Sequence, residues 1–238
     1  MKFEDLNLHP SLLKAVNKQN YTTPTAIQQK AIPLVLQRQD VLGSAQTGTG
    51  KTAAFALPIL HHLIKEQQNN NKSKIRALVV TPTRELAIQI GENFTAYSEY
   101  NKIKNTVIFG GVKQLKQTNR LKNGVDVLVA TPGRLLDLIG QGFICLKDIS
   151  YFVLDEADRM LDMGFIHDIK KIIEKLPKQR QSLFFSATMP KNIIALSNTI
   201  LINPKKVAVH QTSTTADTIT QSIYYTNKSD KKDLLFHI

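Results

Sequence analysis

Ala45-Gln46-Thr47-Gly48-Thr49-Gly50-Lys51-Thr52 is a glycine-rich loop that ends in Gly-Lys-Thr. Small residues let successive backbone N–H groups converge on phosphate oxygens, and the helix after such a loop offers them the positive end of its dipole. Lys51 adds a point charge, and the Thr52 hydroxyl is suited to bind Mg²⁺. All eight residues are therefore candidates for contacting a nucleotide during phosphoryl transfer or nucleotide-driven switching.

One position departs from the usual Gly-x-x-x-x-Gly-Lys-Ser/Thr pattern, because Ala45 stands where the first glycine is expected. The alternative interpretation is a turn before an amphipathic helix. Residues 40–42 predict a short apolar strand before the loop, and residues 52–63 predict a largely apolar helix after it. This strand-loop-helix order is the context that a phosphate-binding loop requires, so it favours the nucleotide site.

The chain of 238 residues carries a formal net charge of +12, and 42% of its residues are hydrophobic. The hydrophobic content suits one large globular domain, and the charge indicates a polyanionic partner such as nucleic acid, although lysines also serve solubility. The single cysteine, Cys145, excludes an internal disulfide. Acidic residues at the start and the lack of a long uncharged apolar run predict a cytoplasmic protein without a membrane segment.

Apolar segments that predict strands alternate with longer helical patterns along the chain. The expected strands are residues 41–44, 77–81, 106–109, 125–130, 152–155, 182–186 and 207–209. Such alternation predicts an α/β fold with a largely parallel sheet and helices on both faces. Ligands are then expected at the carboxyl ends of the strands.

The segment Tyr151-Phe152-Val153-Leu154-Asp155-Glu156-Ala157-Asp158 predicts a strand that delivers consecutive acids to its carboxyl end. Asp155 is suited to hold Mg²⁺, directly or through water, and Glu156 is suited to polarise the attacking water. A solvated acidic turn is the alternative. Because phosphoryl transfer needs a metal-holding carboxylate beside the phosphate loop, the pairing favours Lys51, Asp155 and Glu156 as catalytic residues.

Asp155-Glu156-Ala157-Asp158 spells DEAD, and with the loop at 45–52 it makes the chain resemble a DEAD-box ATP-dependent RNA helicase. Further motifs of that family follow in the expected order: Tyr21-Thr22-Thr23-Pro24-Thr25-Ala26-Ile27-Gln28, Pro82-Thr83-Arg84-Glu85-Leu86-Ala87, Gly110-Gly111, Thr131-Pro132-Gly133-Arg134 and Ser186-Ala187-Thr188. The resemblance covers nearly the whole chain and is closest to the bacterial RhlE-type branch. It implies a RecA-like P-loop fold. Ala45 agrees with the resemblance, because the phosphate loop of this family commonly begins with alanine.

The resemblance implies that residues 1–30 contain the Q motif, which recognises adenine. Gln28 is expected to recognise the adenine edge with an amide that donates and accepts at once, which selects ATP over GTP. Tyr21 is expected to stack on the base, with Phe3 supporting the segment. Asn20 stands where the family usually has glycine, and asparagine tolerates left-handed backbone angles. Without the resemblance, the aromatic residues would be core or surface and Gln28 an ordinary helix residue.

The resemblance also implies that Ser186 and Thr188 form hydrogen bonds toward Asp158, which couple the nucleotide site to strand separation. The alternative is that one of the two hydroxyls caps the helix that begins near Pro190. The two interpretations are compatible with each other.

The family places RNA across three loops, each of which follows a predicted strand. The residues concerned are Pro82, Thr83, Arg84, Gly110, Gly111, Thr131, Pro132, Gly133 and Arg134. Glycines allow close approach of the RNA backbone, threonine hydroxyls and helix-start N–H groups bind phosphate, and the arginines contribute charge or brace the loops. Taken alone, each loop is an ordinary helix-start turn. Nearby basic residues either extend this track or form a solvated helical face: Lys102, Lys104, Lys113, Lys116, Arg120 and Lys122.

Residues 1–210 are predicted to form the N-terminal RecA-like ATPase domain, and residues 211–218 a linker. Residues 219–225 resemble a new strand and residues 231–238 the start of a helix, so residues 219–238 predict the start of a truncated second RecA-like domain. A tail that docks back on the first domain is the alternative. As the family implies, a complete second domain would bring arginines that stabilise the transferring phosphate.

These observations together predict an ATP-dependent RNA helicase. It is expected to bind ATP, Mg²⁺ and one RNA strand, regardless of RNA sequence, and to hydrolyse ATP during local duplex unwinding in the full-length enzyme. This chain alone is expected to bind nucleotide weakly, hydrolyse it slowly and unwind nothing. The alternatives are a P-loop nucleotide kinase or metabolic ATPase with an incidental basic surface, and a nucleic-acid-binding module without turnover.

Overall fold

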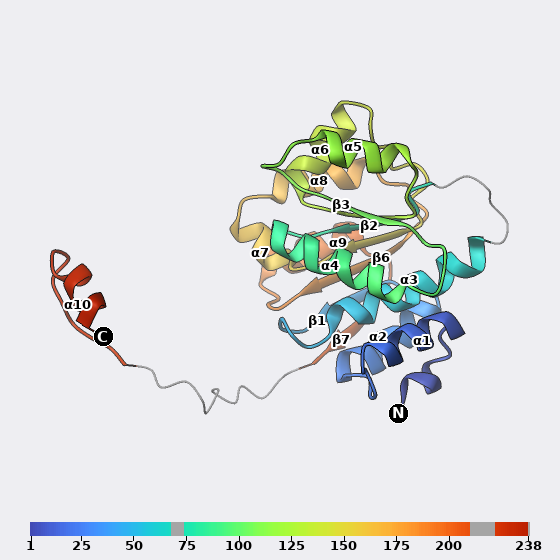
Figure 1. The fold of residues 1–238 in the computed structure, drawn as a ribbon, viewed down its shortest axis with the longest axis horizontal. Coiled ribbons are helices and arrows are strands. Elements are labelled where there is room, and N and C mark those ends of the chain that lie inside the picture. Colours follow the sequence, from blue (N-terminus) through green and yellow to red (C-terminus); the bar gives the residue numbers. More distant parts are fainter. Residues whose placement is uncertain (68–73, 210–221, 238) are drawn as a thin grey trace.

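A parallel sheet forms the centre of the molecule (Figure 1), for which the computed structural model describes residues 1–67, 74–209 and 222–237. Seven described strands lie in the order β3-β4-β2-β5-β6-β1-β7, and every neighbouring pair is parallel. The strands are β1 (Val41–Ser44), β2 (Ala77–Val80), β3 (Asn105–Ile108), β4 (Val127–Ala130), β5 (Tyr151–Leu154), β6 (Gln181–Ser186) and β7 (Lys205–Ala208). The predicted α/β fold is confirmed, and each expected strand lies within two residues of its observed bounds.

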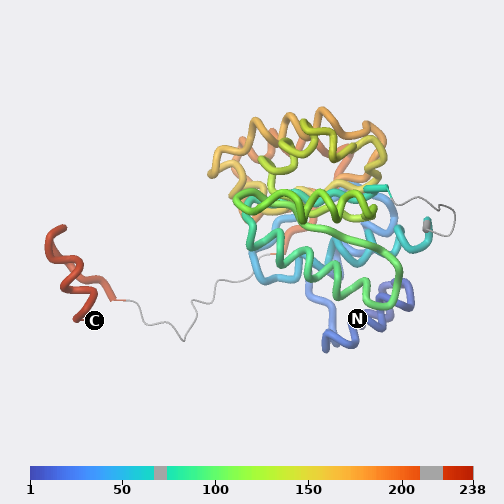
Figure 2. The backbone as a smooth tube through the Cα atoms, turned by 45° about the horizontal axis from the view of Figure 1, so that its top comes forward, coloured from blue at the N-terminus to red at the C-terminus, as the bar shows by residue number. Residues whose placement is uncertain are grey.

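Helices cover both faces of the sheet, as Figures 1 and 2 show from two directions. One face carries a short 3₁₀ helix (Phe3–Leu6), α1 (Pro10–Lys18), α2 (Ala26–Leu36), α3 (Lys51–Gln67) and α4 (Arg84–Tyr97). The other face carries α6 (Pro132–Gly140), α7 (Ala157–Asp162), α8 (Ile166–Glu174) and α9 (Lys191–Ile200), with α5 (Leu115–Lys122) beside β3. The sheet is therefore the middle of three layers.

The core has two halves because successive side chains of a strand point to opposite faces. Val79 and Val153 join the cluster that contains α1 to α4, whereas Leu78 and Phe152 join the cluster on the other face. All four residues of β2, of β4 and of β5 are buried. This burial explains why these strands are continuously apolar in the sequence.

The carboxyl ends of the strands bring both halves of the predicted site to one edge. β1 runs into the loop at 45–50 and then into α3, which begins at Lys51. β5 runs into Asp155 and Glu156 and then into α7. Only β6 separates β1 from β5 in the sheet, so the two connections lie close together.

The C-terminal segment differs from its prediction. Residues 211–218, the predicted linker, lie outside the described residues. The strand expected at 219–225 is wrong over its described part, since residues 222–225 are not in a strand, and a strand without a paired neighbour is not stable in water. The expected helix is present as α10 (Lys231–His237). No described side chain of residues 222–237 is buried, so the structure gives no support to the tail that docks back.

None of the helices in the described parts of the chain combines the length and hydropathy that crossing a bilayer requires.

Candidate functional site

The loop at 45–50 and the first turn of α3 form one wall of a pocket of about 470 Å³ at the carboxyl edge of the sheet, here called the phosphate-loop pocket. Gly48 and Gly50 have left-handed backbone angles, with φ of +81° and +92°. Only glycine adopts such angles without cost, and a Cβ at Gly50 would also overlap the Gln28 amide. Ala45 is buried beneath the loop, and its N–H donates to the Ser186 carbonyl.

Lys51 carries a buried charge that no hydrogen bond satisfies. Its ammonium lies 3.7 Å from Asp155 Oδ1, and each side chain is only 6% exposed. Among the described residues, no acceptor lies within hydrogen-bonding distance of Lys51 Nζ. A buried ammonium normally has several acceptors because its desolvation is costly. Lys51 therefore has three N–H groups available for an anionic ligand in the pocket.

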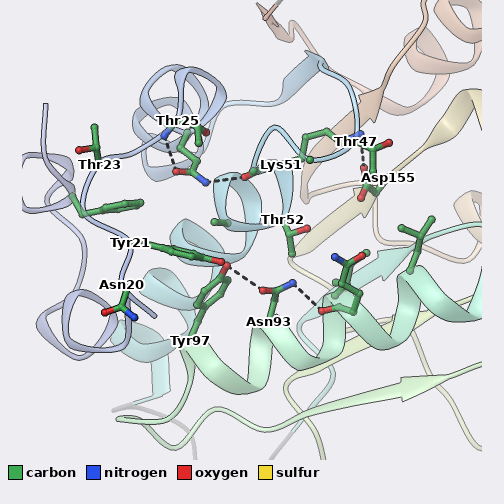
Figure 3. A pocket seen from close by; sticks show the side chains of 18 of the residues that line it. Asn20, Tyr21, Thr23, Thr25, Thr47, Lys51, Thr52, Asn93, Tyr97 and Asp155 are labelled. Atoms are coloured by element: carbon green, nitrogen blue, oxygen red, sulfur yellow. Dashed lines mark hydrogen bonds and ion pairs between the residues drawn. The ribbon is translucent and has the colours of Figure 1, made fainter. Parts of the chain in front are cut away.

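Asp155 is buried against β5 and faces Lys51 (Figure 3). Burial raises the pKa of Asp155 to about 6, and the nearby Glu156 carboxylate adds to the rise while Lys51 opposes it. The carboxyl group is thus ionised at neutral pH and protonated in mild acid. A metal ion or other cation beside it would favour the ionised form.

Glu156 lies at the start of α7 in a strained backbone conformation. Its φ of +54° is in the left-handed region, which is uncommon for residues other than glycine and is often found at functional sites. One carboxylate oxygen accepts a hydrogen bond from the Thr47 hydroxyl at 3.4 Å, and the other pairs with Arg159 at 3.3 Å. Thr47 thereby connects the phosphate loop to the acidic pair, and Thr52 lines the same pocket.

The opposite wall of the pocket comes from the N-terminal segment. Gln28 Oε1 accepts from the Thr25 N–H at 2.9 Å, and Gln28 Nε2 donates to the Gly50 carbonyl at 3.0 Å. The amide therefore joins α2 to the phosphate loop, and one N–H and one lone pair remain for a ligand. Asn20 has a φ of +58°, in the left-handed region that asparagine tolerates. Tyr21 is partly exposed and Phe3 is buried beneath the segment.

One helix face in the pocket is missed by sequence reasoning. It belongs to α4 and consists of Leu86, Gln89, Ile90, Asn93 and Tyr97. Figure 3 shows Tyr97 beside Tyr21, and the two rings meet edge to face with centroids 6.5 Å apart. Residues three or four apart share one helix face, so this spacing is visible in the sequence. The pattern does not distinguish a face that lines a pocket from one that packs in the core.

The DEAD segment contacts the strand that ends at Ser186. Thr188 donates to Asp158 Oδ2 through both its N–H and its hydroxyl, each at 2.9 Å, and Ser186 Oγ accepts from the Asp158 N–H at 3.2 Å. The predicted contacts between these three residues are present. Burial alone would raise the pKa of Asp158, but its hydrogen bonds, of which those from Thr188 are the strongest, together outweigh burial and lower that pKa.

The alternative role of these hydroxyls as helix caps is wrong. α9 begins after Pro190, and no side chain caps its first turn. The Ser186 hydroxyl instead donates to the Thr188 carbonyl at 2.8 Å. The Thr188 hydroxyl donates to Asp158, so both hydroxyls form contacts outside the first turn of α9.

A second groove, of about 570 Å³, lies along the three loops predicted to meet RNA and is here called the three-loop groove. Seven of the nine predicted residues line it: Pro82, Thr83, Arg84, Gly110, Thr131, Gly133 and Arg134. Gly111 does not line it, because the Arg84 guanidinium packs against its backbone and would overlap a Cβ there. Pro132 is buried as the first residue of α6.

The two arginines of this groove brace its loops. Arg134 donates to the Val112 carbonyl at 3.4 Å and pairs with Asp137 at 3.4 Å, while one of its terminal nitrogens is buried without a partner among the described residues. Thr83 caps α4, since its hydroxyl oxygen accepts from the Leu86 N–H at 3.3 Å. The helix-start interpretation therefore holds for Thr83, whereas Thr131 caps α6 with no side-chain hydrogen bond.

Comparison with known proteins agrees with this arrangement. The model of the DEAD/DEAH box helicase family matches residues 25–196. The chain is 44% identical over 236 residues to the DEAD-box ATP-dependent RNA helicase RhpA of Helicobacter pylori, covering 99% of this chain and 47% of the relative. It is 41% identical to the ATP-dependent RNA helicase RhlB of Actinobacillus succinogenes, covering 98% of this chain and 57% of the relative.

A solved structure shares the fold. The crystal structure of a DEAD box protein from Methanococcus jannaschii superposes with a TM-score of 0.81 at 41% identity, over 87% of this chain and 56% of that one. The chain spans about half the length of the curated relatives it matches. The placement in an RhlE-type branch stays a prediction. The phosphate loop, the DEAD segment and these similarities lead to one conclusion, which is that the chain belongs to the DEAD/DEAH box helicase family.

Proposed function

We propose that this chain is the ATP-binding N-terminal part of an ATP-dependent RNA helicase. The observation that carries the proposal is the buried Lys51 ammonium, which has no hydrogen-bond acceptor and lies 3.7 Å from the Asp155 carboxylate. A triphosphate supplies the missing acceptors, and a divalent cation suits the carboxylate. The relatives' names, DEAD-box ATP-dependent RNA helicase and ATP-dependent RNA helicase, describe the same activity.

The residues of the phosphate-loop pocket fit ATP from the base to the last phosphate. Gln28 offers its remaining N–H and lone pair to the adenine edge, and Tyr21 offers a partly exposed ring for stacking. Loop residues Gln46, Thr47, Gly48, Thr49 and Gly50 present backbone N–H groups to the phosphates, and Lys51 adds its charge. Ala45 supports the loop from below, because its N–H already donates to the Ser186 carbonyl. The contacts at the base select ATP over GTP, and the contacts of the loop bind the phosphates of either nucleotide.

Asp155 and Thr52 are the residues that would hold Mg²⁺, which when bound neutralises charge on the phosphates. Glu156 takes the role of positioning the attacking water and accepting its proton. Its carboxylate is fixed on one side by the Thr47 hydroxyl and on the other by Arg159. Hydrolysis thus depends on side chains from α3 and its loop, on one face of the sheet, and from the start of α7, on the other face.

The three-loop groove is proposed to bind one RNA strand. Exposed Gly133 and the loop at Gly110 permit close approach of a phosphate backbone, and Arg84 and Arg134 offer guanidinium groups to phosphates beside the Glu85 and Asp137 carboxylates of the same groove. Contacts of this kind meet phosphate and sugar, so binding is independent of base sequence and falls steeply with salt. Asp158, Ser186 and Thr188 connect the acidic pair to β6 and are proposed to couple the two sites.

The remaining parts of the proposal concern the whole protein. Residues 1–210 form the ATPase domain, 211–218 the linker and 219–238 the beginning of a second RecA-like domain, whose arginines would complete the transition-state site. The protein acts in the cytoplasm. A nucleotide kinase or metabolic ATPase gives no reason for a second groove lined by glycine-containing loops and two arginines near the nucleotide site, so the helicase accounts for more of the molecule.

ATP turnover with and without single-stranded RNA tests the proposal. It is measured on this chain and on a version extended by the second domain. We expect slow turnover by the chain alone, RNA-stimulated turnover by the extended version, and duplex unwinding only by the latter. Turnover that ignores RNA in the extended version would support a metabolic ATPase, and no turnover at all would support a binding module. Unwinding by the chain alone would contradict the need for a second domain.

A further inference from the structure

The outer edge of β3 lies between α4 and α5 (Figure 1). A groove along this edge is separate from the phosphate-loop pocket and adjoins the three-loop groove, since Val112 in its lining accepts a hydrogen bond from Arg134. β3 is the end strand of the sheet, and β4 is its partner among the described strands. The groove measures about 970 Å³ and is here called the edge groove. Its lining includes Ile88 and Glu92 from α4, Val107 from β3, Phe109, Val112, and Lys116 and Arg120 from α5.

The backbone of β3 presents hydrogen-bonding groups to this groove. The carbonyls of Lys104 and Ile108 accept hydrogen bonds from the β4 side. Residues of a strand turn their N–H and C=O groups alternately to the two sides, so Asn105, Val107 and Phe109 face away from β4. An unpaired edge of this kind is a template for another strand.

One of these outward positions is already paired, and the way it is paired shows what the edge accepts. Buried Gln117 donates its amide N–H to the Phe109 carbonyl at 3.1 Å and accepts from the Phe109 N–H at 3.2 Å. This is the pattern that a residue of a neighbouring strand would make. Within the described part of the chain, no group forms such a bond with the outward N–H or C=O of Val107.

The walls of the groove differ in chemistry. Ile88 and Val112 are 40% and 44% exposed, which leaves apolar surface open beside Val107. On the α5 side, Lys113, Lys116 and Arg120 are exposed, and none forms an ion pair with a described carboxylate. Lys116 and Arg120 are four residues apart and share one helix face. Glu92 is the acidic residue across the groove.

We propose that the edge groove binds an extended acidic peptide of a partner protein, which adds to β3 as a further strand. Backbone pairing with Asn105 and Val107 gives affinity, alternate apolar side chains contact Ile88 and Val112, and carboxylates face Lys116 and Arg120. A second copy of this chain is disfavoured, because each copy carries a net charge of +12. An open backbone edge and an apolar floor suit a peptide better than an RNA phosphate chain.

Backbone pairing is tested without altering the protein. The probe is an acetylated, fluorescent nine-residue peptide that alternates valine with aspartate, and the readout is fluorescence anisotropy. We expect a dissociation constant on the order of micromolar. In an added strand, alternate N–H groups face β3, so N-methylation of one alternate set abolishes binding and N-methylation of the other set leaves it unchanged. Equal effects of the two sets, or no binding by the unmodified peptide, would overturn the proposal.

Charge reversal tests the basic residues on the α5 side of the edge groove. The double variant Lys116→Glu and Arg120→Glu should weaken the peptide by about tenfold or more. The matched control is Lys205→Glu with Lys206→Glu, which makes the same charge change on exposed residues of β7 at the other sheet edge, and should weaken it less than twofold by our estimate. An oligouridylate that displaces the peptide, and whose own affinity falls in the first variant only, would show that the groove belongs to the RNA track and would refute the peptide proposal.

Discussion

The phosphate-loop pocket and the three-loop groove lie at the same edge of the sheet, but they hold their charges differently. In the pocket, Lys51 and Asp155 are each 6% exposed, and the ammonium has no hydrogen bond among the described residues. In the groove, the Arg134 side chain is 12% exposed, but it donates to the Val112 carbonyl and pairs with Asp137, which is 47% exposed. A buried charge without hydrogen bonds is costly to maintain, whereas a pair with an exposed partner costs and contributes less. Lys51 therefore depends on a bound ligand for its hydrogen bonds, whereas Arg134 has partners within the protein.

The largest expected effect is on the pocket. Lys51→Ala should weaken ATP binding by about 100-fold, because charge-assisted hydrogen bonds to phosphate are lost. RNA affinity should not change. A fluorescent ATP analogue measures the first, and anisotropy of a labelled RNA measures the second. Lys65→Ala, which removes an exposed lysine of the same helix, is the control and should behave as the parent. Equal losses of affinity for ATP and for RNA would show that Lys51 does not act at the nucleotide site alone.

The pocket should also be sensitive to pH. Burial raises the pKa of Asp155 to about 6, so the carboxyl group becomes protonated below that pH and no longer attracts Mg²⁺. Affinity for ATP with Mg²⁺ should be constant above pH 6 and fall by about tenfold per pH unit below it. The measurement is the difference between the parent and Asp155→Asn, which cancels protonation of the nucleotide itself. Parallel profiles for the two proteins would show that Asp155 does not hold the metal.

A substitution in the three-loop groove should have a smaller effect than Lys51→Ala, and the effect should be the same for every RNA sequence. Arg134→Ala should reduce affinity for single-stranded RNA by about fivefold for all sequences and lower the slope of its salt dependence by about 1. ATP affinity should stay unchanged. Titrations of several RNA sequences at three salt concentrations provide the test, again with Lys65→Ala as control. A loss confined to one sequence would indicate contacts with bases and not with phosphates.

The smallest effect is expected at Thr188, which is proposed to couple the two sites. Thr188→Ala removes the hydroxyl that donates to Asp158 and keeps the backbone N–H bond, so the free energy of unfolding should fall by at most about 1 kcal/mol. Urea unfolding measures this, and Thr188→Ser should retain the bond and the stability. In the extended protein, Thr188→Ala should lower unwinding more than ATP turnover. Equal losses of the two activities would argue against a coupling role.

Local sequence patterns were enough to predict the central strands and to bring together the phosphate loop and the acidic pair. The strands could be predicted because those of the sheet centre are buried on both faces and are therefore apolar throughout, as in Ala77 to Val80. The acids after β5 and the loop after β1 could be brought together because parallel strands end at one edge. Both inferences need only the residues of a short segment and the expectation that neighbouring strands are parallel.

The features that could not be predicted depend on contacts between segments that are distant in the sequence. Tyr97 and Asn93 in the pocket are placed by the packing of α4 against α3 and α1, which no local pattern records. The bond of Gln28 to the Gly50 carbonyl likewise joins residues 22 positions apart. The end position of β3 follows from strand order, and strand order is set by the whole set of crossovers. The strand expected at 219–225 is absent over its described residues, 222–225, because β-propensity alone supplies no paired neighbour.

A crystal structure of the chain with a non-hydrolysable ATP analogue and Mn²⁺ would show whether the buried Lys51 ammonium binds phosphate. We expect phosphate oxygens within hydrogen-bonding distance of Lys51 Nζ, the adenine against Gln28 and Tyr21, and an anomalous Mn²⁺ peak beside Asp155. An ordered nucleotide bound elsewhere, or one in the pocket whose phosphates leave the Lys51 ammonium without an acceptor, would refute the ATP site proposed for this pocket.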